Sequence, residues 1–374
     1  IMVLGYNWDQ LSRGARAVIS FIPLAIAQAL CGWMLGTGRR SAAWREGVGT
    51  LLVLALGASL ALIAQTYNLG GTWQDFMLTW MLLSLPVVYL LQSAACGMWF
   101  MAGITAWLTG SWDHSHVLGF WPLLAAVMPF IVWKIRGNQD GPGVIFLTLT
   151  LIICMGIALG FSLSKDIAVL WIQAYAAFFA VLFLIGAARF SATPGAWQIP
   201  MLAIGAGGTA IMAFLLTFQW PWHHLPPLAL FTKATLHQPA TVLTLSIIAA
   251  LMLAAVALWA GAVRRRDFFL QLYGAFPFMT LLGYALAFRK VPLLCALLFN
   301  AYFLALALLP LIKGIKTSRL GLLNVGMLML MTLILARFFD AKVSLLVKGV
   351  TFILAGIVFL TINIVMLKRK RAAQ

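Results

Sequence analysis

Charged residues are scarce in this sequence. Only 9% of its residues are Asp, Glu, Lys or Arg, whereas ordinary soluble domains carry about 25%. Hydrophobic residues make up 63%, and the mean hydropathy is +1.02. No polar stretch is long enough to form a soluble domain. These shortages exclude a soluble protein and predict an all-α bundle of membrane helices.

Acidic residues and cysteines are the rarest functional groups. The chain has eight acids, with Glu46 as its only glutamate, too few and too scattered for an enzyme that needs paired carboxylates. Its four cysteines lie far apart inside apolar runs, which favours buried thiols over disulfides or metal ligands. Nucleotide, hydrolase and metalloprotease motifs are absent. We therefore expect no catalytic residue, no cofactor and no metal site, with zinc at His114 and His116 as the weaker alternative.

Long apolar runs recur from end to end, each able to cross a hydrocarbon core of about 30 Å. The predicted membrane helices are 15–36, 47–66, 74–92, 94–109, 117–134, 144–162, 167–187, 201–219, 241–263, 268–288, 292–312, 320–338 and 344–367. Residues 1–6 resemble the end of one more helix, because the chain begins without Met or a charged segment. The sequence thus predicts about 13–14 helices in a single membrane domain, residues 1–374, whose first helix and any cytoplasmic N-terminal segment start earlier.

The basic residues predict the orientation of the chain. Lys and Arg concentrate on the cytoplasmic side of membrane proteins, and Lys368 to Arg371 follow the last predicted span. Strict alternation then places Arg39, Arg40 and Arg45 on the same side. The net charge of +17 therefore reflects topology rather than nucleic-acid binding. We predict a multi-pass protein of the bacterial inner (cytoplasmic) membrane with a cytoplasmic C-terminus.

Residues 336–349, ARFFDAKVSLLVKG, depart from this charge pattern. They join the last two predicted spans on the outer side, yet they include Arg337, Asp340 and Lys348. Lys348 falls about one turn inside the last apolar run, where an unpaired cation is costly. We predict that these three side chains form one cluster facing the protein, with Lys348 snorkelling to the headgroups as the alternative. Bases on this side indicate recognition of an anion or contact with lipid headgroups.

Further polar residues are predicted on the same outer side. The first loop carries Asp9, Arg13 and Arg16, and the span 47–66 ends next to Gln65 and Tyr67. If these loops meet, they form a polar vestibule that binds substrate. Interfacial anchoring is the alternative for Gln65 and Tyr67.

The connection 219–240 is predicted to lie along the outer interface. It contains Trp220 and Trp222, which we expect to be interfacial anchors.

Glu46 lies in WREG, at the cytoplasmic mouth of the span 47–66. A lone carboxylate at the edge of a span is a candidate for proton coupling. The alternative is a structural role, because a helix N-terminus favours a negative charge and Arg45 is an adjacent partner.

Several segments resemble a known family. YNWDQL, WREG, AQTYN and TWMLLSLPVVYLLQS near the start, and RFFD, KGVTFILAG and KRKR near the end, resemble the bacterial predicted membrane proteins of domain of unknown function 2157. The resemblance is densest over residues 5–93 and 336–371. It implies a short cytoplasmic segment and one more helix before residue 1, and it implies no activity and no catalytic residue.

The leading hypothesis is a transporter or a flippase-like translocase of a lipid-linked substrate, which recognises an anionic group from the outer side. Many spans, little mass outside the membrane and outer charges motivate it. Its partners would be membrane lipids and an anionic small molecule or lipid-linked substrate, not nucleic acid. The alternative is a non-catalytic membrane scaffold, or a subunit bound to a membrane protein partner.

Overall fold

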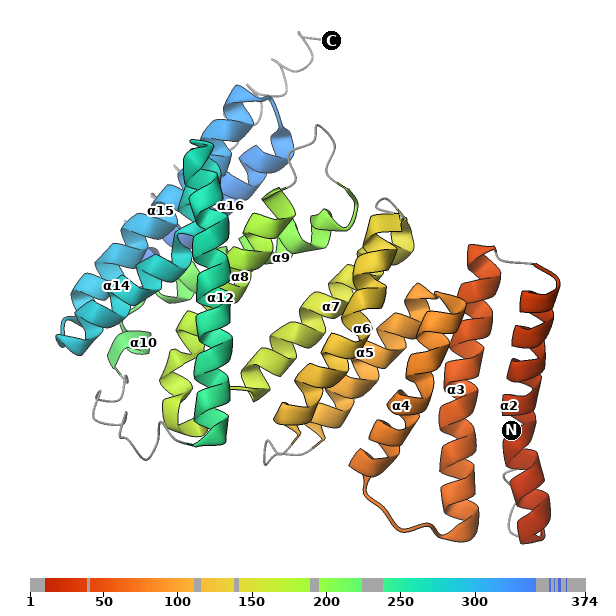
Figure 1. The fold of residues 1–374 in the computed structure, drawn as a ribbon. Helices are drawn as coiled ribbons and strands as arrows, with labels where there is room; N and C mark the ends of the chain where they lie inside the picture. The colour runs from red at the N-terminus through yellow and green to blue at the C-terminus, as the bar shows by residue number, and fades with distance from the viewer. Residues whose placement is uncertain are drawn as a thin grey trace. The chain divides into compact units, whose positions relative to one another are not determined.

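The computed structural model describes residues 11–38, 41–110, 116–137, 141–188, 195–223 and 238–340, together with 350, 353, 356, 357 and 361. Within these ranges every regular element is a helix (Figure 1). Among the described residues, ten helices are long and apolar enough to cross a membrane, or eleven if one bent pair is counted as a single span. The predicted fold class, an all-α polytopic bundle, is confirmed.

Each predicted span from 15–36 to 320–338 coincides with a helix or a pair of helices. The span 94–109 is a helix of 16 residues, shorter than the others. The span 268–288 is broken into two helices that meet at 43°. The predicted remnant 1–6 and most of 344–367 lie outside the described residues, so those two crossings stay predictions.

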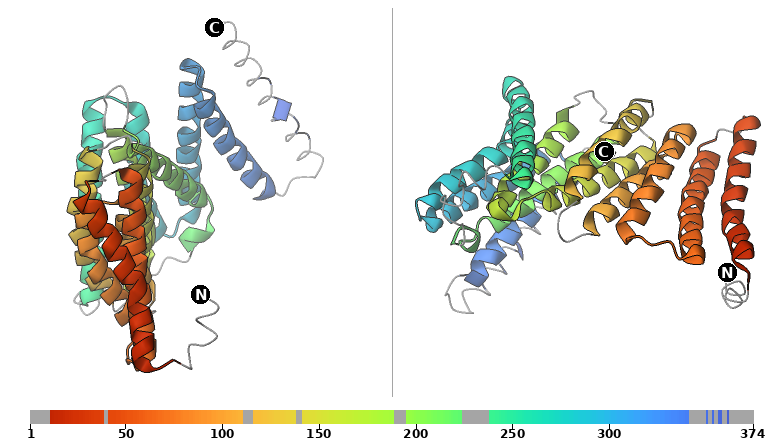
Figure 2. Two further views of the ribbon diagram at one scale, coloured as in Figure 1. Left: turned by 90° about the vertical axis from the view of Figure 1, so that its right-hand side faces the viewer. Right: turned by 60° about the horizontal axis from the view of Figure 1, so that its bottom comes forward.

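The chain divides into two compact units. Unit 1 comprises residues 1–165, 189–201 and 239–244. Its helices are α2 (Arg13–Gly36), α3 (Ala42–Tyr67), α4 (Trp73–Leu91), α5 (Ala94–Thr109), α6 (Val117–Gly137) and α7 (Pro142–Phe161). The short helix α5 is central and packs against α3, α4, α6 and α7, and α2 lies beside α3 at one edge (Figures 1 and 2). Because α5 is covered on most sides, Phe100 and Ile104 are fully buried, whereas Trp99 is exposed.

Glycines in unit 1 receive side chains from neighbouring helices. The ring of Trp80 lies so close to Gly57 that a Cβ there would be 2.4 Å from it, and its Nε1 donates to the Val53 carbonyl at 2.8 Å. Met81 occupies the same kind of gap at Gly103. The helices of unit 1 therefore pack by placing large side chains in the spaces that glycines leave on neighbouring helices.

Unit 2 comprises residues 166–188, 202–238 and 245–374. Its elements are α8 (Trp171–Ala188), α10 (Trp220–His223), α13 (Phe268–Gly274), α14 (Phe276–Phe288), α15 (Pro292–Lys316) and α16 (Leu320–Asp340), with most of α9 (Gln198–Leu215) and α12 (Pro239–Arg264); the 3-10 helix Lys165–Leu170 leads into α8. Main chains approach closely here. A Cβ at Gly205 would lie 2.3 Å from the backbone nitrogen of Phe183, and one at Gly326 would lie 2.6 Å from that of Leu311. Glycine thus permits α8 to pack on α9, and α15 on α16, at backbone contact.

The break between α13 and α14 follows from two residues. Pro277 has no N–H, and its ring clashes with the carbonyl one turn earlier. Gly274 lies beneath the Trp259 side chain, where a Cβ would be 2.9 Å from the indole. Proline and the close indole together explain why the apolar run 268–288 bends instead of continuing as one helix.

One aromatic residue was placed wrongly by the sequence. Trp222 is 3% exposed, stacked on Phe299 at 5.3 Å, and it donates from Nε1 to the Leu216 carbonyl. It is therefore part of the core of unit 2 rather than an interfacial anchor, because that hydrogen bond satisfies its polar atom inside the protein. Trp220 is 57% exposed, in keeping with the predicted anchor.

Candidate functional site

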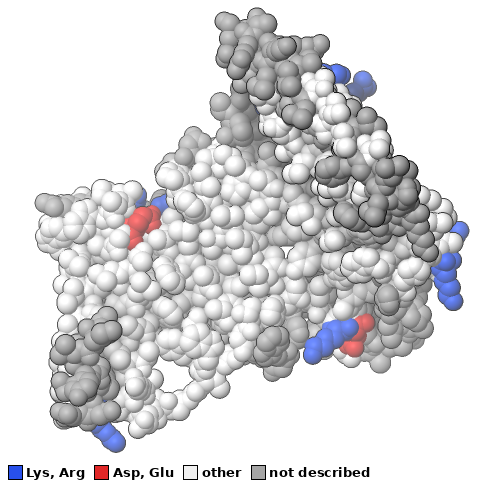
Figure 3. All heavy atoms as spheres, turned by 180° about the vertical axis from the view of Figure 1, so that it is seen from behind, with Lys and Arg blue, Asp and Glu red and all other residues white. Residues whose placement is uncertain are grey.

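Charged side chains gather in a few places on the described surface, and the face drawn in Figure 3 carries wide uncharged areas between them. Two polar sites are built around half-buried charges from the sequence hypotheses, Glu46 in unit 1 and Arg337 in unit 2. A third polar site, at the broken span of unit 2, contains no charge. Each site is built within one unit.

Glu46 lies one turn inside α3, and its carboxylate reaches the N-terminus of α5. It accepts from the Ser93 hydroxyl at 2.5 Å and from the backbone N–H groups of Ala94 at 3.0 Å and Ala95 at 2.7 Å. Ser93 is also the N-cap of α5. Backbone N–H groups at the start of a helix lack partners within it, so the carboxylate satisfies two of them and complements the helix dipole.

Lys134 from the last turn of α6 completes this site. Its Nζ donates to the Gln92 carbonyl at 2.6 Å and lies 3.9 Å from Glu46 Oε1. The Lys134 side chain is 12% exposed and that of Glu46 is 33% exposed. The ion pair that the structure describes for Glu46 is with Lys134 rather than with Arg45, the partner that the sequence suggested. Lys134 is within reach because the end of α6 lies beside the start of α5.

These contacts can be compared with the predicted membrane side of the helix ends. Strict alternation assigns the start of α3, the start of α5 and the end of α6 to one side of the membrane, and Glu46, Ser93 and Lys134 do meet in unit 1. The Glu46 side chain is engaged at each oxygen. The carboxylate of Glu46 thus joins α3, α5 and α6.

Arg337, from the last turn of α16, lies against the end of α9. Its Nη2 donates to the Thr217 carbonyl at 3.1 Å and to the Thr217 hydroxyl at 2.7 Å, and its guanidinium carbon lies 4.7 Å from the centre of the Phe218 ring. The side chain is half-buried. A cation at the carbonyl end of a helix is favoured by the dipole, and the aromatic face adds a cation–π contact.

Asn300 from α15 meets the same carbonyl. Its Nδ2 donates to the Thr217 oxygen at 3.0 Å and to the Ala296 carbonyl at 2.7 Å. The end of α9 is thereby held from two helices by one charged and one neutral donor. This confirms the interhelical role that polar residues within spans are expected to have.

Most other predicted members of the outer cluster fall outside what the structure describes. Lys348 and Asp9 lie in undescribed segments, and for Asp340 the backbone belongs to α16 but the side chain is not described. The predicted grouping of Arg337 with Asp340 and Lys348 therefore stays a prediction.

The remaining candidates lie in unit 1 and are more exposed. Arg13, Gln65 and Tyr67 are exposed, whereas Arg16 is half-buried and donates from Nε to the Leu11 carbonyl. The predicted vestibule that would unite them with Arg337 stays a prediction.

The sequence analysis did not identify a polar site at the broken span. Gln173 is 3% exposed and donates to the Pro277 carbonyl at 3.2 Å, while Thr280 donates to Gln173 Oε1 at 2.8 Å. Gly274 and Pro277 inside the apolar run were the available signal, because interruptions of this kind mark discontinuous helices.

Two further carbonyls at the break are also satisfied by side chains. Tyr302 donates to the Leu272 carbonyl at 2.7 Å, and Trp259 donates from Nε1 to the Gln271 carbonyl at 2.9 Å. The donors come from α15 and α12, whereas Gln173 comes from α8. Neutral side chains from three helices therefore donate hydrogen bonds to the backbone carbonyl groups near the break.

Comparison with known proteins identifies a family over the first part of the chain. The model of the family described as "Predicted membrane protein (DUF2157)" matches residues 1–97. That stretch contains Glu46 and the start of α5, but neither Lys134 nor Arg337. No curated protein and no solved structure matches the chain. Residues 1–97 are thus similar to the DUF2157 family of predicted membrane proteins, the family that the sequence resemblance indicated.

Proposed function

We propose that the protein is a transporter or a translocase of a lipid-linked substrate, recognising an anionic group from the outer side of the bacterial inner membrane. The broken span α13–α14 carries this proposal. Discontinuous helices are the elements from which many transporters build substrate sites, because their free backbone groups lie within the membrane. A break held by Gln173, Thr280 and Tyr302 is such an element.

Neutral hydrogen bonds suit a helix break that rearranges. In membrane proteins such bonds contribute on average about 0.6 kcal/mol each, so exchanging one set for another has a small cost. Ionic contacts in the same place would fix one geometry more firmly. The break in unit 2 is therefore the proposed moving element.

Arg337 supplies the proposed anion contact. Its Nη2 already binds two oxygens of Thr217, and a carboxylate or phosphate oxygen offers a stronger acceptor for a guanidinium than a neutral carbonyl does. In the proposed mechanism the anionic group replaces Thr217 as partner of Arg337 when substrate enters from the outer side. Glu46 is the proposed proton-coupling residue on the other side.

Reconstitution of the purified full chain into liposomes tests this function. The probes are fluorescent phosphatidylglycerol, which is anionic, and fluorescent phosphatidylcholine, which has no net charge, each followed by chemical quenching of the outer leaflet. We expect faster movement of the anionic probe, and a loss of at least about tenfold in Arg337→Gln, the size of a lost charge-assisted bond.

Arg136→Gln is the matched control, because Arg136 is an exposed base at the end of α6. It should move the anionic probe at the wild-type rate. Liposomes in which neither probe moves, or in which Arg337→Gln equals wild type, would contradict the proposed function.

A scaffold is the second candidate, and one observation favours it. Glu46, Lys134, Asp75 and Arg337 all bind backbone groups, as charges do when their role is to hold helices. A stoichiometric membrane protein partner that co-purifies from native membranes, combined with no movement of either probe, would establish the scaffold instead.

A further inference from the structure

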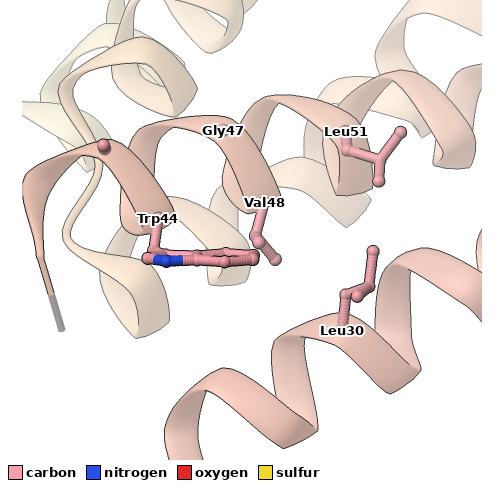
Figure 4. Close-up of a pocket in the computed structure, with 6 residues that line it drawn as sticks. Leu30, Trp44, Gly47, Val48 and Leu51 are labelled. Carbon is pink, nitrogen blue, oxygen red and sulfur yellow. The ribbon is translucent and has the colours of Figure 1, made fainter. Parts of the chain in front are cut away.

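An apolar groove lies on the surface of unit 1 between α2 and α3. It has a volume of about 360 Å³ and is lined by Leu30 of α2 and by Ala43, Trp44, Gly47, Val48 and Leu51 of α3 (Figure 4). In the close-up, Trp44, Val48 and Leu51 face Leu30 across the open space. Gly47 leaves the groove wide, since a Cβ there would meet no atom within 4 Å.

The position of the groove along the helices suggests what fills it. Its lining comes from the first turns of α3 and the later part of α2, at the end where a short connection joins the two helices. Trp33 and Trp44 lie at this end with ring centres 5.3 Å apart, and both are partly exposed. Tryptophan is enriched at the boundary between acyl chains and headgroups. The groove therefore begins at headgroup level and continues into the hydrocarbon region.

The charge at this end is positive. The connection carries Arg39 and Arg40 in the sequence, and Arg45 follows in the first turn of α3. The only acid of this stretch, Glu46, is already bound at the start of α5. The Nε atom of Arg45 is buried and has no hydrogen-bond partner among the described residues. A base such as Arg45 near an apolar groove is complementary to an anionic amphiphile.

We propose that this groove binds one acyl chain of an anionic phospholipid from the cytoplasmic leaflet, with the phosphate held at Arg45 in the first turn of α3. The side follows from the predicted orientation, and anionic lipids make the surface of that leaflet negative. This lipid site does not depend on the proposed transport. It holds a lipid in place, whereas the transport proposal concerns movement of a substrate through unit 2.

Native mass spectrometry of the purified, delipidated full chain tests this site. The protein is titrated separately with phosphatidylglycerol and with phosphatidylcholine, and the fraction carrying one lipid is measured. We expect tighter binding of phosphatidylglycerol. Arg45→Gln should weaken its binding by about fivefold, the effect of one base near an anionic lipid, and should leave phosphatidylcholine binding unchanged.

Two glycine variants separate groove filling from general effects on the helices. Gly47→Leu fills the groove and should weaken phosphatidylglycerol binding by about tenfold or more, as burial of the acyl chain is lost. Gly32→Leu is the matched control: a Cβ at Gly32 also meets no atom within 4 Å, but this residue does not line the groove, so binding should stay at the wild-type level. Both changes favour the helix, so neither should unfold the protein.

Three results would overturn the lipid site. They are equal affinity for the two lipids, unchanged phosphatidylglycerol binding in Gly47→Leu, and equal losses in Gly47→Leu and Gly32→Leu. A tightly bound protein that occupies the groove and is released by Gly47→Leu would also overturn it, because the occupant would then not be a lipid. Translocation assays do not enter this test, so its failure is distinguishable from failure of the transport proposal.

Discussion

Unit 1 and unit 2 join their helices in different ways. In unit 1 the glycine gaps take side chains, such as Met81 at Gly103 and Trp80 at Gly57. In unit 2, Gly274 also faces a side chain, but Gly205 and Gly326 lie against the main chain of the neighbouring helix. A side chain can rotate away from an added methyl group, but a backbone in a packed helix cannot do so without moving the helix. A glycine that faces a side chain should therefore tolerate substitution by a larger residue better than a glycine that faces the backbone of another helix.

The half-buried charged sites of the two units differ in the sign of their charge. Unit 1 places an anion, Glu46, at a helix N-terminus, and unit 2 places a cation, Arg337, at the carbonyl end of a helix. Both follow the helix dipole. Glu46 and Arg337 thus each bind unpaired backbone groups at the end of a helix. At the broken span, neutral side chains bind the backbone instead.

The largest effect is expected for Gly205→Ala in unit 2. Its Cβ would lie 2.3 Å from the Phe183 nitrogen and 2.7 Å from the Phe183 Cα, so α8 and α9 must separate. We expect a loss of about 3 kcal/mol in the free energy of unfolding, measured by denaturant unfolding in micelles. Gly207→Ala on the same helix is the control, because its Cβ meets nothing within 4 Å; it should be neutral or slightly stabilising. Equal losses in the two variants would remove the distinction between the units.

Glu46→Gln in unit 1 should have the next largest effect. The amide oxygen can replace one acceptor, but the charge opposite Lys134 and at the α5 N-terminus is lost. We expect about 2 kcal/mol of destabilisation, measured in the same way. The double variant Glu46→Gln with Lys134→Met should lose less than the sum of the single changes. Strict additivity would show that the two side chains do not interact.

Arg337→Gln in unit 2 should cost about 1.5 kcal/mol, because the half-buried side chain loses its charge-assisted bond to Thr217 and its contact with Phe218. Arg337→Lys should recover only part of this, since an ammonium cannot make the same planar contacts. Full recovery by lysine in a thermal unfolding assay would mean that charge alone matters.

Gly103→Ala in unit 1 should show the smallest effect. The added methyl group displaces Met81, whose sulfur would lie 2.0 Å away, but methionine is flexible and can refill the space. The gain in helix propensity offsets part of the strain, so we expect a change below about 1 kcal/mol. If Gly103→Ala lowered the free energy of unfolding as much as Gly205→Ala, side-chain and backbone contacts at glycine would not differ in the way proposed.

The helices were predictable because length and hydropathy decide them. Apolar runs of sufficient length have to form helices in a membrane, and the predicted ends near Leu91 and Pro292 agree with α4 and α15. The break at Ala275 was not predicted, although Gly274 and Pro277 were visible signals for it. The mean hydropathy of a run is the same whether the helix is straight or bent.

The sites were predicted less well than the helices. The sequence singled out Glu46 and Arg337 by their rarity, but the partners Ser93, Lys134 and Thr217 depend on which helices are neighbours. Single-sequence reasoning has no measure of that packing. The place of Gln173 at the broken span became clear only from its contact with Pro277.

The central claim is that the broken span α13–α14 moves, and a distance across the break tests it most directly. Spin labels at Phe268→Cys and Leu282→Cys are suitable because both positions are exposed, in a background lacking the four native cysteines. We expect pulsed electron spin resonance in lipid nanodiscs to give two distances for the otherwise unchanged chain, with their proportions altered by Gln173→Leu. A single narrow distance that Gln173→Leu leaves unchanged would contradict the account.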